Sequence, residues 1–228
     1  MKKEVFMLLG VKDMSIPFVS TSGCISNYRT ILDAMFLNGW SRSVSIPRPS
    51  DNRLKESIFR SRISYDEYRY LNYRSGGLNF GGMLEDFYLN SYHSCFFIEL
   101  GIQYPTGCVI RDNHWRELLD CCKQHHLLLW LNLQNGGLGE KRFQEELQPV
   151  RECIENGVEC ILSIDFSRSL GLQNNGIGCV VAFVDKADPS LLYSGFQSSV
   201  YCLEKFYSLF SDDDSRFRWF GIKSEYYI

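Results

Sequence analysis

The sequence predicts an α/β fold with three layers, α/β/α, around a mostly parallel sheet. Apolar runs of strand length alternate along the chain with amphipathic helical segments, which is typical of this class. The run Leu127–Leu131 is continuously apolar, and such runs indicate strands buried on both faces. With 228 residues, 45% of them hydrophobic, the chain can build a sizeable core. We therefore expect one domain spanning residues 1–228.

Six segments are predicted as strands. Each combines strand length with an apolar run, and a helical pattern or a more polar stretch separates each from the next. In chain order, the predicted strands are Ser43–Ile46, Tyr68–Tyr73, Cys95–Leu100, Leu127–Leu133, Val158–Phe166 and Ile177–Val184.

Apolar residues that repeat at i, i+3, i+4 and i+7 identify the helical segments. The first helix is predicted over Ile25–Phe36, directly after a turn rich in serine and threonine. The second is expected to begin at a capping Asp112 or Asn113. Its apolar face consists of Trp115, Leu118, Leu119 and Cys122.

A further apolar stripe predicts a helix that ends at Asn156-Gly157, because glycine is a good C-terminal signal. Pro149 lies inside this stripe, and a proline there either kinks a helix or moves its start to a later residue. The stripe consists of Phe143, Leu147, Val150 and Ile154.

The overall charge narrows the classes of partner. A formal net charge of −3 and a pI near 5.8 give no field that attracts nucleic acid or an anionic membrane. No apolar run reaches the roughly 18 residues that a membrane helix needs. The apolar core of Met1–Gly10 is too short for a secretion signal. We therefore predict an intracellular protein that neither binds nucleic acid nor inserts into a membrane.

Nine cysteines, with no Cys-x-x-Cys pair, predict a reducing compartment rather than a disulfide framework. Most of them lie in apolar segments, where cysteine acts as a small hydrophobe. The segment Cys121–His126 would place one Cys-His pair on each of two helix faces, which does not close a metal site. We interpret it as a helix end with Cys122 in the core, and we predict no metal.

Four segments carry a resemblance to a known family. In chain order they are Leu78–Asp86 (LNFGGMLED), Tyr104–Gly107 (YPTG), His114–Leu118 (HWREL) and Asp165–Leu172 (DFSRSLGL). Their order and spacing resemble those of the fold-type I pyridoxal-phosphate enzymes, and most closely the aspartate aminotransferases. The resemblance implies the three-layer α/β/α fold of that family's large domain.

At the position of the family's Schiff-base lysine, this sequence has Arg168. In the family, the lysine condenses with the cofactor aldehyde and later shuttles a proton. A guanidinium stays protonated across the accessible pH range, so it offers neither a free amine nor a proton-accepting form. The resemblance therefore implies that this chain is not an active aminotransferase.

Other contacts to the cofactor ring are replaced as well. The family's aspartate partner of the pyridinium nitrogen aligns with Asn132, which has no charge to keep that nitrogen protonated and so weakens the electron sink. The asparagine that bonds the ring oxygen aligns with Tyr104, and a nearby tyrosine aligns with Asn135. The stacking tryptophan aligns with Asp51.

The contacts to the cofactor phosphate are also altered. Asp165 stands at the position of a phosphate-binding serine, and a carboxylate repels a phosphate dianion. The clamping arginine aligns with Gly176, which removes a bidentate donor. The resemblance thus implies a degenerate pocket at Ser20, Thr21, Ser22, Asp51, Tyr104, Asn132, Asn135, Asp165, Arg168 and Gly176.

One phosphate-binding element is preserved in outline. The turn Ser20–Gly23 resembles the family's Ser-Gly-Thr-Gly loop, whose amides at a helix N-terminus suit an anion. A plain Ser/Thr helix cap explains the same four residues. Because the clamping arginine is absent, we favour the helix cap.

Asp165 and Arg168 lie three residues apart and carry opposite charges. We hypothesise that they pair and, together with Asn132 and Tyr104, fill the former cofactor site with protein polar groups. The alternative is that each substitution arose independently, in which case an exposed pair contributes little energy. An exposed Arg168 beside an open pocket would contradict the hypothesis.

The resemblance also implies that the family's small domain is missing. Only 19 residues precede Ser20, and the substrate-binding arginine that the small domain supplies has no counterpart. The arginine that a partner subunit supplies in the family aligns with Ser190. A lid that excludes water and grips a substrate is therefore not expected.

The sequence thus predicts a catalytically inactive aminotransferase-like protein that serves as a structural or assembly subunit, without pyridoxal phosphate. Protein partners are expected, in a hetero-oligomeric assembly or in a dimer through the large-domain face. Two alternatives remain open: a transaminase-like enzyme with altered chemistry, and a module that binds a phosphorylated metabolite. The family occupies both the mitochondrion and the cytoplasm, and the sequence favours neither.

Overall fold

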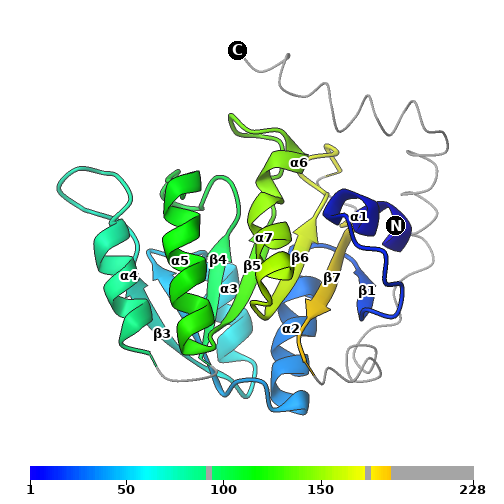
Figure 1. Ribbon diagram of the computed structural model, residues 1–228, viewed down its shortest axis with the longest axis horizontal. Coiled ribbons are helices and arrows are strands. Elements are labelled where there is room, and N and C mark those ends of the chain that lie inside the picture. The colour runs from blue at the N-terminus through cyan, green and yellow to red at the C-terminus, as the bar shows by residue number, and fades with distance from the viewer. Residues whose placement is uncertain (91–93, 173–175, 186–228) are drawn as a thin grey trace.

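Seven strands form one sheet in the spatial order β1-β7-β6-β5-β4-β2-β3 (Figure 1). The computed structural model describes residues 1–90, 94–172 and 176–185, so Ser190 lies outside the described residues. β7 runs antiparallel to both of its neighbours, and the other neighbouring strands are parallel. The strands are β1 (Phe18–Thr21), β2 (Ser43–Arg48), β3 (Ser64–Arg69), β4 (Cys95–Glu99), β5 (Leu128–Leu133), β6 (Cys160–Asp165) and β7 (Gly178–Phe183).

Helices cover both faces of this sheet. In Figure 1, α4, α5 and α7 lie in front of the sheet and α2 and α3 lie behind it, and the buried side chains form two separate clusters. The predicted three-layer fold around a mostly parallel sheet is therefore confirmed. No helix in the described part of the chain has the length and apolar character to cross a membrane. The helices are α1 (Lys2–Leu9), α2 (Cys24–Asn38), α3 (Asn52–Phe59), α4 (Phe80–Tyr88), α5 (Asp112–His125), α6 (Phe143–Glu146) and α7 (Gln148–Asn156).

Five of the six predicted strands are confirmed, with bounds shifted by at most two residues. The prediction Tyr68–Tyr73 was wrong, because β3 begins at Ser64 and ends at Arg69. The first four residues of β3 are exposed at the sheet edge, so the apolar pattern pointed beyond them to the buried tyrosines. β1 was missed because half of it is the Ser20-Thr21 pair, which is typical of a turn.

The predicted helices are present, but their start signals differ. α5 begins at Asp112 with Arg111 at the N-cap position, so neither Asp112 nor Asn113 caps it as predicted. The stripe around Pro149 is divided into α6 and α7, with the proline in the first turn of α7, where its missing N–H has no cost. α7 ends as predicted, with Gly157 in the left-handed conformation at φ 67°.

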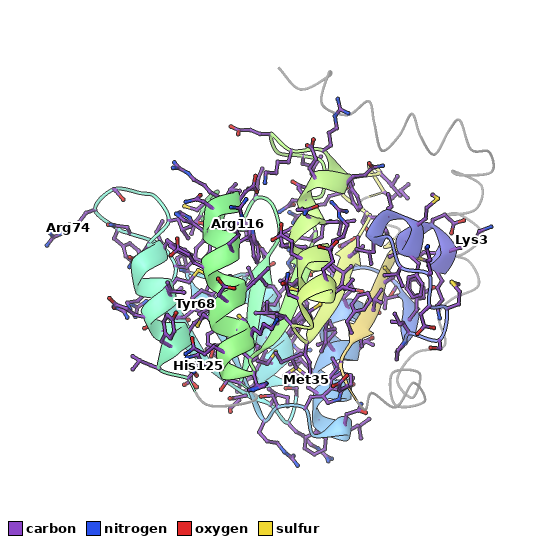
Figure 2. All side chains as sticks on the ribbon, viewed as in Figure 1. Lys3, Met35, Tyr68, Arg74, Arg116 and His125 are labelled. Carbon is purple, nitrogen blue, oxygen red and sulfur yellow. The ribbon has the colours of Figure 1, made fainter. Side chains whose placement is uncertain are left out.

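The segment Cys121–His126 forms the end of α5. Cys122 is fully buried in the core, His125 is the last helical residue and His126 is the C-cap, as the helix-end interpretation predicted. Figure 2 shows Arg116 and His125 toward opposite ends of this helix. Among the residues that the structure describes, no group of three or more His, Cys, Asp or Glu side chains is placed to hold a metal ion.

Aromatic side chains anchor α4 against the β3 and β4 side of the sheet. Phe87 is fully buried, and its ring centroid lies 5.5 Å from that of Tyr68 and 3.7 Å from that of Phe96. The Tyr68 hydroxyl donates to the Phe97 carbonyl oxygen at 3.0 Å, so its polar end is also satisfied. This cluster therefore packs α4 against β3 and β4.

We predict that Phe87→Ala lowers the free energy of unfolding by about 3–5 kcal/mol, because it removes a fully buried ring and leaves a cavity. The matched control is Phe59→Ala, since the Phe59 side chain is 87% exposed and its removal should change stability by less than about 0.5 kcal/mol. Urea denaturation of both variants measures the difference. Equal losses in the two variants would contradict the described packing.

Candidate functional site

The carboxyl ends of β4, β5 and β6 meet at one edge of the sheet, beside the N-termini of α2 and α3. In open α/β sheets, ligands bind at this edge. A cavity of about 900 Å³ opens here. Its lining residues are Ser22, Gly23, Cys24, Ile25, Arg53, Leu138, Asp165, Ser167, Arg168 and Gly176.

Asp165, the last residue of β6, caps the N-terminus of α2. Its Oδ2 accepts a hydrogen bond from the Cys24 N–H at 3.0 Å, and its Oδ1 accepts one from the Ser167 N–H at 2.8 Å. A carboxylate is favoured there, because the first amides of a helix lack partners within the helix and the helix dipole is positive at that end. The carboxylate thus takes an amide that an anionic ligand at this helix end would use.

Beside the same helix N-terminus, the backbone of Gly176 packs closely against that of Ser22 and Gly23. Gly23 has φ 100°, in the region that favours glycine, and a Cβ added to it would lie 3.2 Å from the Gly176 Cα. A Cβ added to Gly176 would overlap the Ser22 carbonyl oxygen. With this backbone arrangement, residue 176 has no room for any side chain, and therefore none for a clamping arginine.

Arg168 does not pair with Asp165, so the hypothesis of an ion pair that fills the site was wrong. The Arg168 guanidinium donates through Nη1 to the Asn135 Oδ1 at 2.8 Å, and the residue is exposed beside the open cavity. Asn135 in turn donates to the Ile102 carbonyl oxygen at 3.3 Å. Asp165 instead accepts hydrogen bonds from the backbone N–H groups of Cys24 and Ser167.

Asn132 and Tyr104 do not fill the cavity either. Asn132 is fully buried within β5, where its Oδ1 accepts a hydrogen bond from the Ser163 hydroxyl at 2.7 Å. That hydroxyl also accepts the Trp130 Nε1–H at 3.0 Å. Tyr104 is 48% exposed, and it reaches the site only through its backbone N–H, which donates to Glu99. Neither residue lines the cavity, and the buried Asn132 Nδ2 has no hydrogen-bond partner within the described ranges of the chain.

Asp51 is the N-cap of α3, with Oδ1 accepting the Arg53 N–H at 2.9 Å. The same carboxylate pairs with the Arg53 guanidinium at 2.6 Å, which raises the pKa of that arginine. Arg53 also donates to the Gln134 Oε1 at 3.3 Å, and so does the Cys24 thiol at 3.4 Å. Burial raises the pKa of the Cys24 thiol to about 12, so the thiol stays protonated and unreactive.

Glu99, the last residue of β4, carries a buried carboxyl, and only 3% of the residue is exposed. Its Oε1 accepts from the Gln134 Nε2 at 2.6 Å and its Oε2 accepts from the Tyr104 N–H. Burial raises its pKa from an ordinary value near 4.5 to about 8, and the charge of Asp51 adds to this, while both hydrogen bonds oppose it. The chain Arg53–Gln134–Glu99 therefore links α3 to the ends of β4 and β5.

The Ser20–Gly23 segment is not the Ser/Thr helix cap that we favoured. Gly23 occupies the N-cap position, and no side chain of the segment makes a cap hydrogen bond. Ser20 and Thr21 belong to β1, where the buried Thr21 hydroxyl donates to the Asn27 side chain. Ser22 is exposed and lines the cavity. Asp165 replaces the predicted hydroxyl cap from 141 residues away along the chain.

The structure adds residues at this edge of the sheet that the sequence reasoning missed. Glu99 could have been found, because it is the single charged residue of an otherwise apolar strand and stands at its carboxyl end. The others carry no comparable signal, since a lone polar residue after a strand or at a helix start is common. The missed residues are Cys24, Arg53, Glu99, Gln134 and Ser167.

An open, mostly parallel sheet with polar side chains gathered at its carboxyl edge beside a helix N-terminus defines a class of α/β proteins that hold ligands at that edge. The particular family is shown by sequence. The family model described as Aminotransferase class I and II matches residues 2–205, and the chain belongs to this family.

Among curated relatives, the mitochondrial aspartate aminotransferase of Gallus gallus is 26% identical over 150 residues, which cover 65% of this chain and 35% of that protein. The mitochondrial aspartate aminotransferase P2 of Lupinus angustifolius is 24% identical over 137 residues, covering 60% and 30%. The chain thus matches about a third of the length of these relatives.

Solved structures confirm the fold. An aromatic-amino-acid aminotransferase from Burkholderia pseudomallei, covalently bound to pyridoxal phosphate, has a TM-score of 0.87 at 18% identity and covers 98% of this chain and 60% of its own. A mitochondrial aspartate aminotransferase from Trypanosoma brucei has a TM-score of 0.82 at 16% identity, covering 98% and 63%. The predicted resemblance to the large domain of this family is therefore confirmed.

The residues of this chain do not fit pyridoxal phosphate as that family holds it. At the corner beside α2, the Cys24 amide is already bonded to the Asp165 carboxylate and residue 176 has no room for a cationic side chain. At the lysine position, Arg168 has no amine that can condense with an aldehyde. The misfit therefore affects both the phosphate end and the aldehyde end of the cofactor.

We predict that Glu99→Gln changes how stability depends on pH. An acid whose pKa is higher in the folded than in the unfolded state contributes stability that is full below its unfolded pKa and is lost as pH rises through the folded pKa. The wild-type free energy of unfolding should therefore fall between about pH 4.5 and pH 8 more steeply than that of Glu99→Gln. Urea denaturation across this range measures the slopes, with the exposed Glu56→Gln as control. Identical slopes in all three proteins would contradict a buried, titrating Glu99.

Proposed function

We propose that this chain is a catalytically inactive member of the aminotransferase class I and II family that acts as a structural or assembly subunit of a larger complex. The inactive part of the proposal is supported by Arg168, which stands where the sequence resembles the family's Schiff-base lysine segment; the residue is exposed and its guanidinium is bonded to Asn135. Without an amine at this position, neither covalent attachment of the cofactor nor proton shuttling is available.

The assembly role is supported by the surface that the fold leaves uncovered. Large apolar side chains are exposed at the ends of two helices, with Phe59 87% exposed at the end of α3 and Leu89 82% exposed after α4. Apolar side chains of this size gain free energy when a partner covers them. A protein partner, in a hetero-oligomer or in a dimer through the large-domain face, would supply that cover.

An alternative function is favoured by the cavity itself. Arg53 and Arg168 both line it, and two guanidiniums beside a helix N-terminus suit an anionic ligand. A module that binds a phosphorylated metabolite, or an enzyme that holds pyridoxal phosphate noncovalently for altered chemistry, would use these groups. We rank both below the structural role, because Asp51 neutralises Arg53 and Asp165 takes a helix amide.

We propose an intracellular location, and both the mitochondrion and the cytoplasm fit the family. The relatives from Gallus gallus and Lupinus angustifolius are mitochondrial proteins. The eight cysteines in the described part of the chain are free thiols, and seven of them are buried, which suits a reducing compartment.

We predict that the purified protein, mixed with pyridoxal phosphate, develops no absorption band beyond that of the free cofactor and none that shifts when aspartate or an aromatic amino acid is added. Borohydride reduction followed by peptide mapping should label no lysine in a fixed ratio of one per chain. A bound cofactor band that responds to amino acids would contradict the inactive assignment and support the enzyme alternative.

The assembly role predicts that the tagged 228-residue chain, at native abundance, elutes in a complex several times its own mass of 26.5 kDa. The double variant Phe59→Ser/Leu89→Ser should dissociate from it while keeping its fold, because both side chains are exposed. Exchange of two other exposed hydrophobic residues, Met7→Ser/Met14→Ser, provides the matched control. Elution of the wild-type protein as a monomer would contradict the role.

A further inference from the structure

We propose that the Asp165 carboxylate takes the place of the cofactor phosphate at the N-terminus of α2. A former ligand site thereby becomes a structural contact between the end of β6 and the start of α2. This inference rests on the proposed loss of cofactor binding and adds a physical cause for it. The contact joins residues 141 positions apart in sequence, with the Asp165 Oδ2 3.0 Å from the Cys24 amide nitrogen.

The charge at this helix end is already balanced by the protein. Asp165 is 7% exposed, and both of its carboxylate oxygens accept backbone N–H groups, from Cys24 and Ser167. A phosphate brought to the same amide would have to displace this carboxylate or lie against it, and two like charges in contact at a buried site repel strongly. The helix end is therefore closed to an external anion as long as the aspartate is present.

The space that an external phosphate would need is also reduced by the backbone. The Gly176 Cα packs against Gly23, and the Ser22 carbonyl oxygen lies where a side chain at position 176 would begin. The Ser167 hydroxyl accepts the Ile177 N–H at 3.2 Å, which holds this segment in place. The backbone packing is independent of the Asp165 hydrogen bonds and leads to the same conclusion.

A second set of polar contacts also joins α2 to the ends of β1 and β6. The Asn27 side chain, one turn into α2, donates through Nδ2 to the Ile164 carbonyl oxygen at 3.0 Å and accepts from the Thr21 hydroxyl. Thr21 and Asn27 are at most 1% exposed. The ends of β1 and β6 are thus tied to α2 by the protein's own groups, and the Asp165 bond completes the tie at the helix terminus.

The test is anion rescue of Asp165 variants. Asp165→Ser and Asp165→Ala remove the carboxylate and leave room beside the free Cys24 amide, whereas Asp165→Asn removes the charge but still fills the space. Thermal unfolding midpoints of the wild-type chain and the three variants are compared in inorganic phosphate and in chloride at matched ionic strength.

We expect the wild-type midpoint to differ by less than about 1 °C between phosphate and chloride, because the site holds its own anion. Asp165→Ser and Asp165→Ala should melt lower than wild type in chloride and recover about 2–4 °C in phosphate, as expected for a ligand bound to the folded state alone. Asp165→Asn should also melt lower but recover less than about 1 °C, since its amide still occupies the site.

Phosphate-specific stabilisation of the wild-type protein would overturn the inference, and so would loss of stability in Asp165→Ser and Asp165→Ala without phosphate recovery. Recovery of Asp165→Asn as large as that of Asp165→Ser would also overturn it, because occupancy would then not matter. The readout is distinct from the test of the proposed function. A wild-type protein with transaminase activity would contradict the proposed function, whatever the melting midpoints show.

Discussion

The hydrogen bond from the Cys24 amide to the Asp165 carboxylate is the interaction on which the rest of the site depends. It joins the end of β6 to the start of α2 and places a negative charge where a helix of this fold is open to anions. Beside this bond, the backbone around Gly176 packs directly against Gly23. Both oxygens of the Asp165 carboxylate bind backbone amides, and Arg168 bonds to Asn135 instead.

The same edge holds a second set of linked polar side chains, which bond to one another. Asp51 caps α3 and pairs with Arg53. Arg53 donates a hydrogen bond to Gln134, and Gln134 donates one to Glu99. Burying Glu99 has a cost, as the raised pKa of this carboxyl indicates. Its two hydrogen bonds offset part of that cost and fix the loop at Tyr104. The fold of the family is thus retained, and these polar groups at the sheet edge are bonded to one another.

The fold could be predicted from the sequence because its signals are local and repeated. Continuous apolar runs identified β4, β5 and β6, and glycine after Asn156 identified the end of α7. β1 and β3 were missed or shifted, because one is short and polar and the other is exposed at the sheet edge. In both cases tertiary pairing, rather than intrinsic propensity, makes the strand.

The site was predicted less well than the fold. The structure places Asn132, Asp165 and Arg168 near the carboxyl edge of the sheet, but with partners that the sequence did not predict. Asp165 and Arg168 are close in sequence and opposite in charge, yet Asp165 binds an amide 141 residues away. Charge alone favours the near neighbour, whereas the geometry of a helix terminus favours the distant one, and only the assembled fold brings that terminus within reach.

The most direct test of this account is a crystal structure of the wild-type protein grown with phosphate and pyridoxal phosphate. The account predicts Asp165 Oδ2 at hydrogen-bond distance from the Cys24 amide nitrogen, near 3.0 Å, with neither anion at the start of α2. A phosphate group bound to the amides of Ser22–Cys24, with the Asp165 side chain turned away, would contradict it.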